Sequence, residues 1–266
     1  ILAIVSRRAR LLNLPWESLN ESDQAYVVTQ FHSVVRRLST DTLPEFQGTP
    51  SDQQFNVLLV APRPTEPDGS TGNLAAETVS VLESVDVQVE LDVLRPPTFA
   101  ALSAHLGENP GRYHLVHLDG ILAAEESGSM IFDQADSPID TVPAAMVAEV
   151  ISKAAVPTVL LNNAGVNPGG SLVAWEDATR TLAEAGIPSV VSVPYPLSGP
   201  AQRHFTMGFY QALIQGGTVP AAVAQARQTL MGNPHRAGAW GPTISWDWLL
   251  PVVYQSAVYI PDAIAK

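Results

Sequence analysis

The sequence of 266 residues contains no cysteine. This absence excludes a disulfide framework, a thiolate zinc site and a cysteine nucleophile. It is consistent with a reducing compartment, and we expect the protein to be cytoplasmic.

Basic residues are also scarce: 14 Lys and Arg stand against 26 Asp and Glu, which gives a net charge of −12. No run of basic residues is interleaved with aromatic side chains, and an acidic surface repels polyanions, so we expect no nucleic-acid partner. Two small groups of arginines are interpreted as solvated or ion-paired rather than as phosphate sites: Arg7, Arg8 and Arg10, and Arg36 and Arg37.

Three further signals are missing. No stretch of 18 or more apolar residues is free of charge and proline, so no membrane span is expected. No Gly-x-Gly-x-x-Gly fingerprint or P-loop lysine is present, so we expect no nucleotide cofactor. The six histidines lack the i, i+4 spacing of a metal pair, and no metal site is expected.

What the sequence does contain, from about residue 55, is an alternation of apolar strands and helical segments. Buried strands are predicted over 55–61, 113–118, 156–162 and 187–193. The intervening segments of helical pattern imply right-handed crossovers and a mostly parallel sheet covered by helices on both faces. One such helix is predicted over 141–154, with Thr141 as its cap.

The first part of the chain is different. Residues 39–54 are polar with two prolines and form the best candidate for a linker or long loop. The 38 residues before them are too few to build a core of their own. We therefore divide the chain into an amino-terminal part, 1–54, which forms an edge of the fold, and an α/β core, 55–266.

Two predicted strands end in segments of functional interest. The strand 113–118 runs into Asp119, Gly120 and Ile121, and the strand 156–162 runs into Asn163 and Ala164. Because α/β proteins place their chemistry at the carboxyl ends of parallel strands, we expect these two ends to converge at one edge of the sheet.

Several segments, in order along the chain, together resemble the CHAT domain, a caspase-like family in the clan of caspases, separase and clostripain. The resemblance covers nearly the whole chain and implies a caspase-like three-layer sandwich. It is carried by Leu-Pro-Trp-Glu-Ser-Leu at 14–19, the strands at 34–38 and 56–64, the helix entry at 94–102, the late helices at 205–216 and 221–230, and the final strand at 248–254.

In that family the first strand end carries Gly-His-Gly and the second carries Asn-Ala-Cys. Here Gly120 matches, but Ile121 and Leu122 follow it, and Ala164 stands near the position of the nucleophilic cysteine. Hydrocarbon side chains can neither carry a proton nor attack a carbonyl. The resemblance therefore implies that the catalytic dyad is missing and that no catalytic residue remains at Ile121 or Ala164.

A vestigial site or groove is expected around these positions, made of His117, Asp119, Gly120, Asn162, Asn163 and Gly165. His117 is interpreted as a polar core histidine rather than as a replacement base. No serine near this edge lies in a Gly-x-Ser-x-Gly elbow that would supply another nucleophile: Ser127, Ser129 and Ser171.

The sequence thus predicts a catalytically inactive pseudopeptidase that acts as a protein-binding or regulatory subunit of a multi-protein, bacterial-type complex. The expected partner is a protein, such as an active peptidase or a sensor subunit, and the resemblance also implies a helical-repeat segment upstream of Ile1. Two alternatives stay open at this point. One is a genuine CHAT cysteine endopeptidase whose active site has been silenced by substitution, and the other is an unrelated α/β enzyme with serine or carboxylate chemistry.

Overall fold

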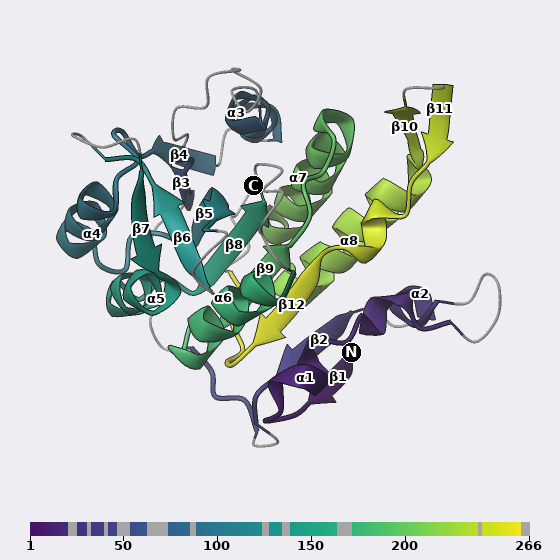
Figure 1. Cartoon of the computed structure of the whole chain (residues 1–266), viewed down its shortest axis with the longest axis horizontal. Helices are drawn as coiled ribbons and strands as arrows, with labels where there is room; N and C mark the ends of the chain where they lie inside the picture. The colour runs from purple at the N-terminus through teal and green to yellow at the C-terminus, as the bar shows by residue number, and fades with distance from the viewer. Residues whose placement is uncertain are drawn as a thin grey trace.

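The computed structural model shows one large mixed sheet between two layers of helices (Figure 1). Eight strands form its main path, and their order from edge to edge is β1 (Leu2–Val5), β2 (Val34–Arg37), β12 (Val252–Gln255), β9 (Ser189–Val193), β8 (Thr158–Asn163), β5 (Leu115–Leu122), β3 (Phe55–Val60) and β4 (Val89–Val93). The structure describes residues 1–20, 26–30, 33–39, 42–46, 54–62, 74–85, 89–123, 128–134, 139–163, 172–238 and 241–261.

The central strands are parallel and buried on both faces. Every residue of β3, β8 and β9 is buried, and these strands are rich in Val and Leu. Such continuous apolar strands are typical of a parallel sheet that is covered on both sides. Along the main path only the pair of β9 and β12 is antiparallel, so the predicted mostly parallel α/β sheet is confirmed.

The helices divide into two layers that cover opposite faces of this sheet. One layer contains α4 (Phe99–Glu108), α5 (Ala144–Lys153) and α6 (Leu172–Glu184). Leu118 and Leu161 of the sheet pack in the hydrophobic core beneath this layer. The other contains α3 (Leu74–Val85), α7 (Gly199–Ile214) and α8 (Val219–Gly232), and its core takes Leu115 and Leu160. Neighbouring residues of one strand therefore serve opposite layers, as the pleat requires.

One predicted helix begins in the wrong place. Residues Asp140–Pro143 form strand β7, and α5 begins only at Ala144, so Thr141 is not its cap. β7 pairs with β6 (Ser129–Phe132), which pairs in turn with the end of β5. The β-branched residues Thr141 and Val142 favour an extended backbone, and pairing with β6 decides the local structure in favour of the strand.

The amino-terminal elements join the same sheet as the core. β1 and β2 are parallel, and Arg36 of β2 pairs with Tyr254 of β12. The short helices of this part are α1 (Ala9–Leu12), the 3-10 turn η1 (Trp16–Ser18) and α2 (Val27–Gln30). The boundary at residue 54 stays a prediction.

Two smaller features complete the described structure. A two-stranded hairpin, β10 (His235–Gly238) and β11 (Gly241–Ile244), extends from the end of α8 and is followed by the 3-10 turn η2 (Asp247–Leu249) (Figure 1).

Of the helices that the structure describes, none has the length and apolar character that crossing a bilayer demands.

Candidate functional site

β5 and β8 are neighbours in the centre of the sheet and run in the same direction. Asp119 pairs with Asn162, and Gly120 pairs with Asn163. The two strand ends that the sequence singles out are therefore adjacent, as expected from their position at the carboxyl edge. We call the set of His117, Asp119, Gly120, Asn162 and Asn163 the strand-tip site.

The side chain of His117 lies fully buried between the sheet and α7. Its Nδ1 is 3.1 Å from the hydroxyl of Tyr210, and the tautomer of the ring decides which group donates. Burial raises the pKa of Tyr210 well above its ordinary value, and the charge of Asp119 raises it further. The phenol therefore stays protonated, and the ring of His117 is not exposed to solvent.

Asp119, two residues further along β5, is also fully buried. Its Oδ1 accepts a hydrogen bond of 2.8 Å from Nδ2 of Asn162, which lies directly opposite on β8. A buried carboxylate requires such donors, because burial of an unpaired charge is costly. The bond ties the two strand ends together.

Asn163 continues this linkage towards the next strand. Its Nδ2 donates a hydrogen bond of 2.8 Å to the carbonyl of Pro194, the residue that follows β9. Side-chain hydrogen bonds of Asn162 and Asn163 thus connect the ends of β5, β8 and β9, in addition to the backbone hydrogen bonds between these strands.

The residues at the expected dyad positions follow directly from this pairing. Ile121 comes after Gly120 within β5, and its backbone pairs with Ile131 of β6. Ala164 and Gly165 come after Asn163 and lie outside the described residues. Of the predicted site residues, the structure therefore brings five together and leaves the position of Ala164 and Gly165 open.

An apolar crevice lies at the same strand ends. It is lined by Leu118 and Leu122 of β5, Leu161 of β8 and Phe132 of β6, with Gly120 beside them. These leucines belong to the layer of α4, α5 and α6, whereas His117 faces α7. Its volume is about 10 Å³, which is too small for a side chain, and its lining offers no group for acid–base chemistry.

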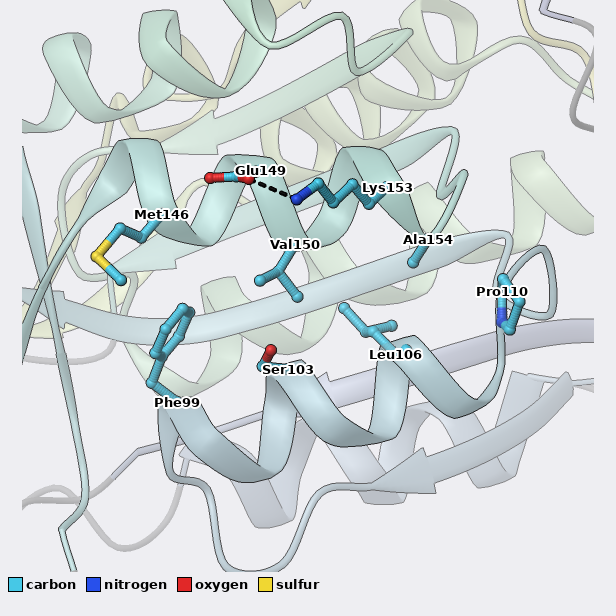
Figure 2. A pocket seen from close by; sticks show the side chains of 10 residues that line it. Phe99, Ser103, Leu106, Pro110, Met146, Glu149, Val150, Lys153 and Ala154 are labelled. Atoms are coloured by element: carbon cyan, nitrogen blue, oxygen red, sulfur yellow. Dashed lines mark hydrogen bonds and ion pairs between the residues drawn. The ribbon is translucent and has the colours of Figure 1, made fainter.

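A larger groove lies between α4 and α5 and has a volume of about 470 Å³ (Figure 2). Figure 2 shows Phe99, Leu106 and Val150 pointing into it, with Met146 at one end and the ion pair of Glu149 and Lys153 on its rim. Ser103 also lines the groove. An exposed ion pair and one hydroxyl do not form a catalytic constellation.

The structure contains a second buried polar group that the sequence did not predict. It consists of Glu17, Arg36 and Arg227, and we call it the ion cluster. Arg36 donates to both carboxylate oxygens of Glu17, at 2.5 and 2.7 Å, and its Nε donates to the carbonyl of Leu12. Arg227 of α8 lies 3.5 Å from Glu17 and donates to the carbonyl of Pro251. These contacts attach the amino-terminal elements to the core.

Neither Tyr210 nor the ion cluster could be recognised from spacing, because their partners are far away in the sequence. Glu17 and Arg36 lie in the segments 14–19 and 34–38, which resemble the family, and this resemblance was the signal in the sequence that pointed to them.

Of the side chains that the structure describes, no three from His, Asp and Glu are grouped as a metal site would require.

Comparisons with known proteins agree with this architecture. The chain is similar to the separase of the Saccharomyces cerevisiae separase–securin complex, in crystal structures at 3.0 and 2.6 Å resolution, with TM-scores of 0.51 and 0.49 and 13% sequence identity in both cases. The match covers 95% of this chain but only 15% of the separase chain. The match with a TM-score of 0.51 shows the fold alone and confirms the caspase-like α/β architecture. No curated protein matches the chain.

The sequence profile of the CHAT domain matches residues 2–259, which is nearly the whole chain. The alternative of an α/β enzyme unrelated to this family is therefore wrong. The chain belongs to the CHAT domain family.

Proposed function

We propose that the chain is a catalytically inactive CHAT domain, a pseudopeptidase that works as a protein-binding or regulatory subunit of a cytoplasmic, multi-protein complex of bacterial type. One observation carries the proposal. The paired residues Gly120 and Asn163 are followed by Ile121 and Ala164, in a chain without any cysteine. Acyl transfer by a cysteine dyad needs a thiolate and a neighbouring base, and these positions provide neither.

The surroundings of the strand-tip site argue against cleavage. His117 is buried against Tyr210, and Asp119 is engaged by Asn162, so neither side chain is exposed to a substrate. An active peptidase or a sensor subunit is the kind of partner that a regulatory homologue would engage.

A cleavage assay tests the inactivity. The purified chain is incubated with a mixture of peptides of varied sequence, and the products are analysed by mass spectrometry. We expect no cleavage above the level of a buffer control. Turnover that persists through repeated purification would overturn the proposal.

Restoring the dyad sharpens the test. The double variant Ile121→His, Ala164→Cys is compared with Ala164→Cys alone, which supplies a thiol without a base. We expect slow peptide cleavage and reaction with a thiol-directed peptidyl inhibitor in the double variant, and at most slow inhibitor labelling in the single one, because a base lowers the effective pKa of the thiol. Equal behaviour of the two variants would show that the strand ends do not present these positions to one another.

A further inference from the structure

Strand β1 forms an open edge of the sheet (Figure 1). Among the described strands, β2 is its neighbour on one side and nothing pairs with the other. The N–H groups of Leu2 and Ser6 donate to the carbonyls of Ser33 and Arg37, at 2.8 and 3.1 Å. Because a residue in a parallel ladder directs its N–H and C=O to the same side, Ala3 and Val5 direct theirs outward.

The sequence of β1 leaves this edge open to pairing. Natural edge strands are very short or carry lysine, proline, bulges or inward-pointing charge; β1 is short, at four residues, but Leu-Ala-Ile-Val contains neither charge nor proline. Val5 at the end of β1 is 40% exposed, and Ile1, which precedes the strand, is 66% exposed. Three further exposed leucines lie within the first 19 residues: Leu11, Leu14 and Leu19.

The charge around β1 has the opposite sign to that of the whole chain. Residues 1–19 contain three arginines, Arg7, Arg8 and Arg10, and a single acidic residue, Glu17, which Arg36 neutralises. All three arginines are exposed, and no acidic residue in the described part of the chain forms an ion pair with them. The net charge of the chain is nevertheless −12.

We propose that the β1 edge binds an extended segment of another protein as an additional strand, and that this segment alternates apolar and acidic side chains. The main-chain groups of Ala3 and Val5 supply two donors and two acceptors, and the exposed side chains of Ile1 and Val5 offer apolar contacts at the two ends of β1. Arg7, Arg8 and Arg10 select acidic side chains over basic ones. A second copy of this chain is disfavoured, because it would bring the same three arginines to the interface.

The inference rests on the proposed function, since it names a surface and a partner chemistry for a protein-binding subunit. The surface is separate from the strand-tip site, because β2, β12 and β9 lie between β1 and β8 in the sheet. The two proposals therefore fail separately. Peptide cleavage by the wild-type chain would overturn the inactivity and leave binding at β1 unaffected, whereas loss of the β1 proposal would leave the inactivity unchanged.

The probe is a fluorescein-labelled peptide of alternating valine and glutamate, roughly eight residues long, which is a common strand length. Its binding to the wild-type chain is measured by fluorescence anisotropy, beside a peptide with lysine in place of glutamate and one with alternate amides N-methylated. We expect saturable binding of the glutamate peptide, and binding about ten-fold weaker or absent for the other two. Equal binding of all three, or binding of none, would overturn the proposal.

Protein variants locate the binding surface. Val5→Pro removes an outward N–H but no bond to β2, and edge strands tolerate such a proline. We expect the Kd to rise about ten-fold, with an unchanged circular dichroism spectrum. Arg7→Glu should raise it about five-fold at low salt, while Arg203→Glu, the same charge change at an exposed position of α7, should leave it unchanged. Equal effects of Arg7→Glu and Arg203→Glu would contradict the role of the β1 edge.

Amide hydrogen exchange gives a readout that needs no variant. In the free wild-type chain the amides of Leu2 and Ser6 are bonded to the β2 strand, whereas those of Ala3 and Val5 face outward. We expect the peptide to slow exchange at Ala3 and Val5 several-fold. Unchanged exchange at both residues would overturn the proposal, and so would a dimer of the chain, seen by sedimentation, that Val5→Pro dissociates.

Discussion

The strand-tip site and the ion cluster are both buried and polar, but they are held together in different ways. In the strand-tip site, Asp119 and Asn162 are direct partners in the register of two adjacent strands, and the amide of Asn162 donates to the carboxylate of Asp119. In the ion cluster, a carboxylate from η1 meets guanidinium groups from β2 and α8. The first is a local consequence of sheet pairing, and the second joins three segments that are distant in sequence.

Because of this difference, we expect the stability of the fold to depend more on the ion cluster than on the strand-tip site. Burial alone would lower the pKa of Arg36, but the charge and hydrogen bonds of Glu17 outweigh it and raise that pKa. Burial lowers the pKa of Arg227 to about 10, which leaves this side chain charged at neutral pH. The ion cluster therefore holds three buried charges, one negative and two positive, and removal of Glu17 or Arg36 takes away the closest partner of a buried charge.

The largest effect is expected from Arg36→Ala. The substitution removes both short hydrogen bonds to Glu17 and leaves that carboxylate buried, with Arg227 at the longer distance of 3.5 Å. Breaking a buried pair in this way costs about 3–5 kcal/mol of the free energy of unfolding. Urea unfolding, followed by circular dichroism, measures the change.

Two controls accompany Arg36→Ala. The triple variant Glu17→Leu, Arg36→Met, Arg227→Met removes the three charges together and should recover much of the lost stability, since buried ionic groups can be replaced by apolar groups. Lys153→Ala breaks the exposed pair with Glu149 and should leave the unfolding midpoint unchanged. If Arg36→Ala were as mild as Lys153→Ala, the ion cluster would not anchor the amino-terminal elements.

A smaller loss is expected from Asn162→Leu in the strand-tip site. The leucine removes the amide that donates to the buried Asp119, and leaving a buried acceptor without that donor costs about 1–3 kcal/mol. The double variant Asp119→Leu, Asn162→Leu removes both partners and should be less destabilised than the sum of the single variants. Additive changes in a double-mutant cycle of urea midpoints would show that the two side chains are not coupled.

These two clusters also show how far the sequence can lead. Apolar strands such as 156–162 and the periodic pairing of parallel strands predict that Asp119 and Asn162 approach each other, because register and alternation are local properties. The partners Tyr210 and Arg227 lie on α7 and α8, and their approach depends on how whole helices pack on the sheet. The strand β7 was missed because Thr141 and Pro143 also suit the start of a helix, and pairing with β6 decides between the two.

The smallest expected effect is a dependence on pH next to the ion cluster. Burial raises the pKa of Glu176 on α6 to about 7, the charges of Asp177 and Glu17 raise it as well, and Arg36 opposes them. The folded chain therefore binds this proton more tightly than the unfolded chain, whose glutamate titrates near 4.5. Its contribution to stability is fully present below about pH 4.5 and is lost as the pH rises through about 7.

Glu176→Gln removes this titration, so its unfolding midpoint should exceed that of the wild type increasingly from about pH 5 to about pH 8. The side chain is half-exposed, and solvent screening keeps the difference small. Glu149→Gln is the matched control of opposite sign, because Lys153 lowers the pKa of Glu149 and that contribution is lost on acidification. Parallel stability curves for wild type and Glu176→Gln would show that burial does not raise the pKa of Glu176.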